Sequence, residues 1–187
     1  LLDRRQFLHS TAASTLAGGA LTGIAWSAAS AARAADAPNQ RVRLGMMGLN
    51  GRGTDLAGSF LNLPGCEIVY LCDVDERAID KAAAVVAKKQ TAVPAKVKDF
   101  RRILDDNQVD ALVVAAPDHW HGPATILACA AGKHVYVEKP ASHNPREGEL
   151  MVESAAKHKR VVQLGTQRRS MPAMIEAVRR LQSGELG

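Results

Sequence analysis

The sequence predicts an α/β fold built on a doubly wound parallel sheet with helices on both faces. Three observations predict it. From Arg41 onward, short apolar runs alternate with segments of helical spacing, which is the pattern of βαβ units. The apolar runs are continuous and do not alternate with polar residues, as expected for strands covered on both faces. A glycine-rich turn at residues 48–53 joins the first run to the first helical segment.

Six strands are expected, each a run of apolar residues that ends at a glycine, a proline or a polar residue. The third run is short and weak, and the fourth is the most apolar. In chain order they are VRLGMMG (42–48), CEIVYLCDV (66–74), PAKVK (94–98), VDALVVAAP (109–117), HVYVEKP (134–140) and RVVQLGTQ (160–167).

Helices are expected between and after these strands, where apolar residues recur at helical spacing. Asp99 is a candidate N-cap, Gly132 closes a helix as a C′ glycine, and Pro145 lies near the start of another. The segments are GTDLAGSFLNL (53–63), ERAIDKAAAVVAKKQ (76–90), DFRRILDDN (99–107), HGPATILACAAG (121–132), PREGELMVESAAKHK (145–159) and PAMIEAVRRLQSG (172–184).

Residues 1–34 have the pattern of a twin-arginine signal peptide. Arg4 and Arg5 precede Phe7-Leu8, a weakly apolar run and a small-residue cleavage site after Ala34. The alternative is an amphipathic helix of the folded domain. The run is too polar for a membrane span. We expect a periplasmic or otherwise exported protein that the twin-arginine translocase carries already folded, so its cofactor would be acquired in the cytoplasm. Residues 35–40 are a linker.

Composition argues against nucleic-acid binding and against a metal site. Aromatic residues make up 4% of the chain, too few for base stacking. The net charge of +5 falls to +3 without residues 1–34, and no basic stripe remains. Cys66, Cys72 and Cys129 have neither disulfide nor CxxC spacing. We expect buried thiols and no metal.

The turn after the first strand resembles a dinucleotide-binding loop, Gly-x-Gly-x-x-Gly. Its middle glycine position holds Asn50, which tolerates left-handed dihedrals better than most residues, and backbone N–H groups at the helix start would hold phosphates. A glycine-rich turn is also a common structural feature. The residues expected to bind the cofactor here are Gly48, Asn50, Gly51, Arg52 and Gly53.

Asp73 strengthens this interpretation because it follows the second strand, 20 positions after Gly53. A carboxylate there accepts hydrogen bonds from both ribose hydroxyls of a dinucleotide. It would repel a 2′-phosphate, so NAD is favoured over NADP. The alternative for Asp73 is a turn or N-cap residue, a role that Asp75 can fill.

Two later strand ends carry polar residues. The loop "PDHWH" contains Asp118, His119 and His121; we expect His119 on the surface and leave His121 open between a surface and a site residue. A metal site is disfavoured, because two histidines at i and i+2 do not face one another well. The strand "HVYVEKP" ends in Glu138-Lys139-Pro140, where α/β folds bind ligands.

These stretches together resemble the Gfo/Idh/MocA oxidoreductase family. "LGMMGLNGRG", "LCDVD", "AAPDHWH", "GKHVYVEKP" and "VVQLGTQRRS" stand in the family's order, and the resemblance runs from Arg41 to the end. It implies that residues 41–187 are an NAD-binding Rossmann domain and the start of a connection to a second, substrate-binding domain. That second domain would carry a general base and most of the oligomer interface, so we expect this stretch alone to be inactive.

The resemblance also assigns site residues. Lys139 would lie beside the nicotinamide as the catalytic residue; the alternative is a solvated lysine. Glu138 would fix that lysine or contact the cofactor, and Pro140 would set a rigid turn, with a cis bond as one form of it. Pro117 and His121 would border the nicotinamide side. A weaker assignment puts Gln167, Arg168 and Arg169 near the second domain.

The leading prediction is an NAD-dependent oxidoreductase acting on a sugar or polyol by hydride transfer at a carbinol carbon. The first alternative is an NAD-dependent glycosidase of the same fold, using transient oxidation and elimination. The second is a non-catalytic NAD-binding protein, which the Glu-Lys-Pro sequence argues against. The expected partners are a small carbohydrate and further copies of the protein.

Overall fold

The computed structural model describes residues 41–185. The predicted signal peptide and linker lie outside the described residues. Within residues 41–185, no helix is long and apolar enough to cross a membrane.

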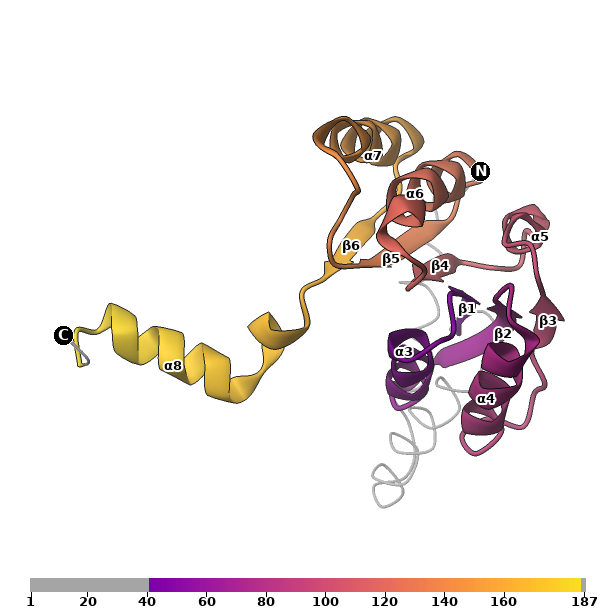
Figure 1. Ribbon diagram of the computed structural model, residues 1–187, viewed down its shortest axis with the longest axis horizontal. Helices are drawn as coiled ribbons and strands as arrows, with labels where there is room; N and C mark the ends of the chain where they lie inside the picture. Colours follow the sequence, from indigo (N-terminus) through magenta and orange to yellow (C-terminus); the bar gives the residue numbers. More distant parts are fainter. Residues whose placement is uncertain (1–40, 186–187) are drawn as a thin grey trace, which may run out of the picture. The chain divides into compact units, whose positions relative to one another are not determined.

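The described residues form a parallel sheet of six strands in the order β3-β2-β1-β4-β5-β6 (Figure 1). This confirms the predicted α/β fold and places all six strands within their predicted runs. Each strand stops one to three residues before the end of its run, since the remaining residues belong to the loops at the carboxyl edge. The strands are β1 (Val42–Met47), β2 (Cys66–Cys72), β3 (Ala95–Val97), β4 (Ala111–Val114), β5 (His134–Glu138) and β6 (Val162–Gly165).

The helices cover both faces of the sheet, with α3 and α4 on one face and α6 and α7 on the other (Figure 1). Two short 3₁₀ turns were not predicted from the sequence: η2 (Asp118–Trp120) and η3 (Gln167–Ser170). The helices are α3 (Arg52–Phe60), α4 (Glu76–Val86), α5 (Arg101–Asp105), α6 (His121–Ala130), α7 (Pro145–His158) and α8 (Pro172–Gln182).

Two apolar cores lie on opposite faces of the sheet, because successive strand residues point to opposite faces. In β4, Val113 packs with α3 and α4, whereas Leu112 and Val114 pack with α6 and α7. Cys72 and Cys129 are buried thiols as predicted, while Cys66 is only half-buried. Burial raises the pKa of the Cys72 thiol to about 12, so it is a packing residue and no nucleophile.

The predicted helix ends are largely confirmed. Asp75 caps α4 by accepting a hydrogen bond from the Arg77 N–H, and Gly132 follows α6 with a φ of +79°. Asp99 accepts a hydrogen bond from the Arg101 N–H, although α5 begins only after Phe100.

α8 differs from the other helices. It contains no buried residue, and its apolar side chains Met174, Ile175, Val178 and Leu181 are exposed.

The strand order places the change of chain direction between β1 and β4. Chain segments leave the carboxyl ends of these two strands toward opposite faces, which opens a crevice at the edge of the sheet. The loops after β1, β2, β4 and β5 therefore meet at this crevice. The predicted catalytic and cofactor-binding residues lie in these loops or at the adjoining ends of helices and strands: Arg52 and Gly53 begin α3, His121 begins α6, and Glu138 ends β5.

Candidate functional site: the carboxyl edge of the sheet

The loop between β1 and α3 can only be made with glycine at two positions. A Cβ atom on Gly48 would lie 2.4 Å from the Ala116 nitrogen, and one on Gly53 would lie 1.8 Å from the Gly48 oxygen. The positive φ angles fall on Gly48 and Gly51, so Asn50 does not adopt the left-handed conformation that the sequence suggested for it. No side chain caps α3, and its first N–H groups are those that an anion would use.

Asp73 joins this loop to the end of β2. Its Oδ2 accepts a hydrogen bond from the Leu49 N–H at 2.7 Å, and its Oδ1 accepts one from the Asp75 N–H at 3.0 Å. An ionised carboxylate has about four lone-pair sites, so each oxygen can accept one more hydrogen bond. The turn role left open for Asp73 is therefore compatible with binding ribose hydroxyls, and Asp75 is the N-cap.

A cavity of about 480 Å³ lies between the ends of β1, β2 and β4. Asp73 and Gly48 line it, together with an aromatic pair: Phe100 and Trp120 meet edge to face with ring centroids 6.0 Å apart. Pro117 also lines this cavity. The structure therefore places Pro117 and Asp73 at the wall of one cavity, and the place of Pro117 beside the nicotinamide, which the family resemblance implies, stays a prediction.

Glu138 connects three segments at the other side of the crevice. This carboxylate is only 4% exposed and accepts hydrogen bonds from Arg52 Nε at 2.9 Å and from Gln167 Nε2 at 3.0 Å. Burial by itself would raise the pKa of Glu138, but the hydrogen bonds from Arg52 and Gln167 outweigh it and lower the pKa. The charged groups of Arg52 and Glu138 thus point at each other, and this pair fixes the end of β5. The Glu138 carboxylate makes no bond to the Lys139 side chain.

Lys139 follows directly and is exposed. Among residues 41–185, its amine has no hydrogen-bond or ion-pair partner, so it is available to a ligand at the carboxyl edge. The Lys139–Pro140 peptide bond is cis, which agrees with the rigid turn expected there.

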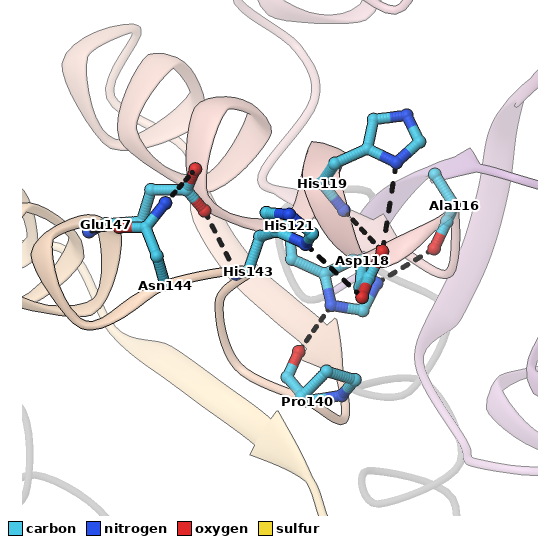
Figure 2. Close-up of polar contacts among 8 residues, drawn as sticks. All are labelled: Ala116, Asp118, His119, His121, Pro140, His143, Asn144 and Glu147. Atoms are coloured by element: carbon cyan, nitrogen blue, oxygen red, sulfur yellow. Dashed lines mark hydrogen bonds and ion pairs between the residues drawn. The ribbon is translucent and has the colours of Figure 1, made fainter.

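His121 occupies the middle of a polar cluster between the loops after β4 and β5 (Figure 2). The ring is 2% exposed; Nε2 lies 2.9 Å from the Ala116 oxygen and Nδ1 lies 2.5 Å from the Pro140 oxygen. His121 is therefore no surface residue, and each of its ring nitrogens faces a backbone oxygen, to one of which a neutral ring donates its N–H.

Asp118, in the loop after β4, pairs with the loop after β5 (Figure 2): His143 Nδ1 lies 3.5 Å from its Oδ2. His119 is exposed, as predicted. Within residues 41–185, no group of three histidine, cysteine or acidic side chains could hold a metal ion.

The sequence missed two residues of this edge. Phe100 lines the cavity from the start of α5, and His143 meets Asp118 from the loop before α7. The sequence indicates them only by position, because each follows the carboxyl end of a strand. That position is not specific, since aromatic residues and histidines there have many structural uses.

A comparison with known families matches residues 42–166 to the Gfo/Idh/MocA oxidoreductase family, described as having an NAD-binding Rossmann fold. A glycosyl hydrolase family 109 protein from Saccharopolyspora erythraea is 36% identical over 126 residues, covering 65% of this chain and 28% of that protein.

Two solved structures share the fold. The myo-inositol 2-dehydrogenase of Lactobacillus plantarum has a TM-score of 0.69 at 24% identity, covering 79% of this chain and 42% of its own. The WlbA dehydrogenase of Bordetella pertussis, in complex with NADH and UDP-GlcNAcA, has a TM-score of 0.68 at 23% identity, and the match covers 79% of this chain and 43% of that protein. The chain thus spans well under half of each of these proteins.

The described residues fit NAD. The close approach of Gly53 to Gly48 gives the flat backbone cradle that a diphosphate needs, and Asp73 stands at the wall of a cavity beside it. The family match covers more than half of the chain. This chain therefore belongs to the Gfo/Idh/MocA oxidoreductase family, and the cofactor of its Rossmann domain is NAD.

Proposed function

We propose that this protein is an NAD-dependent oxidoreductase that acts on a sugar or a polyol. One observation carries the proposal: the exposed Lys139 amine, unpartnered among residues 41–185, stands at the end of β5 in a domain whose cofactor is NAD. A lysine whose charge is not used by the fold is available for a reacting group. The likeness to a myo-inositol 2-dehydrogenase supports a polyol as the substrate class.

The chemistry divides between the cofactor and the chain. NAD⁺, when bound, would supply the acceptor for a hydride from the carbinol carbon. Lys139 donates a hydrogen bond to the hydroxyl oxygen on that carbon and stabilises the negative charge that develops there as the carbonyl forms. The hydroxyl proton passes to a general base outside the described residues. Asp73 and the glycine loop bind the cofactor and leave its reactive end toward Lys139.

The proposal is tested by measuring NADH formation at 340 nm with a panel of polyols and sugars. Lys139→Ala should lower turnover by about 10²–10³-fold, the typical cost of losing one charge-stabilising donor, while the dissociation constant for NAD stays the same. Lys159→Ala, at the exposed end of α7, is the matched control and should change neither. Unaltered turnover in Lys139→Ala would contradict the assignment.

A glycosidase is the second candidate, because a glycosyl hydrolase family 109 protein is 36% identical to this chain. Here bound NAD would supply a transient hydride acceptor, and oxidation of the sugar would acidify the neighbouring C–H bond. A base would remove that proton, the aglycone would leave with the electrons of its C–O bond, and water would add at the anomeric carbon. Return of the hydride would then restore the hydroxyl within one turnover. Release of nitrophenol from nitrophenyl glycosides without net NADH would favour this candidate over the oxidoreductase. A protein that binds NAD and does neither would support a binding role only.

Export by the twin-arginine route is part of the proposal, on the strength of Arg4-Arg5 followed by Phe7-Leu8. Replacing both arginines with lysine should retain the protein in the cytoplasm, as measured by fractionation. Equal amounts of both forms in the periplasm would contradict it.

A further inference from the structure

His121 is a buried polar side chain whose two ring nitrogens contact the main chain of two different loops. Nε2 faces the Ala116 oxygen, in the loop after β4, and Nδ1 faces the Pro140 oxygen, in the turn after β5 (Figure 2). A buried imidazole without partners would cost free energy. A carbonyl oxygen only accepts, so a neutral ring donates its one N–H to one of these two oxygens, and only the protonated ring donates to both. Each nitrogen faces the main chain, so the ring acts on the loops themselves.

The ladder between β4 and β5 ends before these loops. Its last pair is Val114 with Val137. Beyond it, the links among residues 41–185 between the two loops are made by side chains: His121 to Pro140, and Asp118 to His143. The Asp118–His143 pair is exposed on both sides, and exposed ion pairs contribute little. The buried His121 ring is therefore the firm connection.

Lys139 stands between two anchored neighbours. On one side, Glu138 is held by Arg52 and Gln167. On the other side, the carbonyl of Pro140 is held by His121. The Lys139 side chain has no polar partner of its own among the described residues, so the fold determines its position through the backbone alone.

We propose that His121 is a positioning residue that sets where the Lys139 amine stands relative to bound NAD, and that it does not contact the cofactor. This inference rests on the proposed role of Lys139. Without the ring, the Lys139–Pro140 turn loses its connection to the end of β4 and moves independently of the cofactor cleft. Binding of NAD is retained, because neither the glycine loop nor Asp73 shares a hydrogen bond with the ring.

The test measures how well NAD shields Lys139 from an amine-reactive acetylating reagent, with the modified peptide quantified by mass spectrometry. In the parent protein, NAD should slow acetylation of Lys139 but not of Lys159. In His121→Leu, NAD should bind with the parent dissociation constant, yet the shielding of Lys139 should be largely lost. His121→Gln, which keeps one N–H donor for one carbonyl, should restore part of it. His119→Leu is the matched control and should behave as the parent.

The outcomes separate the two hypotheses. If NAD binds but never shields Lys139 in the parent protein, the proposed function fails. If NAD shields Lys139 equally in the parent and in His121→Leu, the positioning role is wrong while the role of Lys139 stands. If NAD affinity falls in parallel with shielding in both His121→Leu and His121→Gln, the ring serves cofactor binding, and the inference is overturned. If His121→Leu does not fold, the comparison of His121→Gln with His119→Leu decides: full shielding in the glutamine variant would refute the inference.

Discussion

The two sides of the crevice are held in place by different means. At the ends of β1 and β2, the contacts span about one βαβ unit: Gly53 lies against Gly48 with no room for a Cβ atom, and the Asp73 carboxylate accepts a hydrogen bond from the Leu49 N–H. At the ends of β4, β5 and β6, side chains make the connections over longer sequence separations, as in the Arg52–Glu138 pair. The first side therefore depends on glycine at close approaches together with one carboxylate, and the second depends on charge and hydrogen bonding alone.

This difference predicts which kind of substitution each side of the crevice tolerates. A cradle of glycines fails when any atom is added, whatever its polarity. A charged link fails when its charge is removed, and so it responds to pH. Four substitutions sharpen this comparison, beginning with the largest expected effect.

Gly53→Ala should unfold the loop or displace it. Its Cβ would lie 1.8 Å from the Gly48 oxygen, so we expect a loss of about 3 kcal/mol or more in the free energy of unfolding and no measurable NAD binding. Gly58→Ala in the same helix is the control: its nearest contact would be an ordinary 3.6 Å, and alanine should stabilise the helix by up to about 1 kcal/mol. Urea unfolding and calorimetry measure both. Equal stabilities for the two variants would refute the close-approach argument.

Asp73→Asn should weaken NAD binding by about 1.5–3 kcal/mol, because hydrogen bonds to a charged acceptor are lost. The same change should narrow the preference for NAD over NADP, since the 2′-phosphate no longer meets a negative charge. Asp75→Asn, two residues on, keeps a good N-cap and should leave NAD affinity intact. Isothermal titration with both nucleotides compares the variants; an unchanged ratio in Asp73→Asn would contradict the ribose assignment.

Glu138→Gln should reduce stability at pH 7 by about 1–2 kcal/mol, discounted because Arg52 is partly exposed. The folded-state pKa of Glu138 is lowered from the ordinary 4.5, so its contribution is present above that value and is lost as the pH falls through the lowered pKa. Denaturant curves of parent and variant should therefore converge in acid. Glu76→Gln, from the exposed pair with Lys98, should show little difference at either pH. A difference in the free energy of unfolding that persists at low pH would mean that the charge of Glu138 does not stabilise the loops at the ends of β5 and β6.

Trp120→Ala should have the smallest effect. Its ring lines the cavity beside Asp73, and an aromatic contact of this kind contributes about 0.5–1.5 kcal/mol. We expect weaker binding of ADP-ribose and no change for nicotinamide mononucleotide, with Trp120→Phe close to the parent. A loss confined to nicotinamide mononucleotide would place the adenosine half elsewhere.

The two sides of the crevice also differ in how far the sequence predicts their contacts. The glycine loop and Asp73 were predicted, because close backbone approach and an acid after the second strand leave a fixed spacing in the sequence. The cis turn at Pro140 was foreseen from the resemblance, and Lys139 remains a prediction. The contacts of Glu138 with Gln167 and of His121 with Pro140 were not predicted. They join residues 29 and 19 positions apart, and no local pattern encodes such a pairing.

The sequence by itself determined the order of strands and helices along the chain and the cradle for the diphosphate, since these follow from local periodicity and from residues that only one conformation tolerates. The resemblance of five sequence stretches indicated the family. Tertiary structure alone decided that Arg52 meets Glu138, that Pro117 shares a cavity with Asp73, and that His121 lies buried between two loops. The reason is geometric: parallel strands that are distant in sequence end at one edge of the sheet, and the partners of a polar side chain there are chosen by distance and burial in the folded chain.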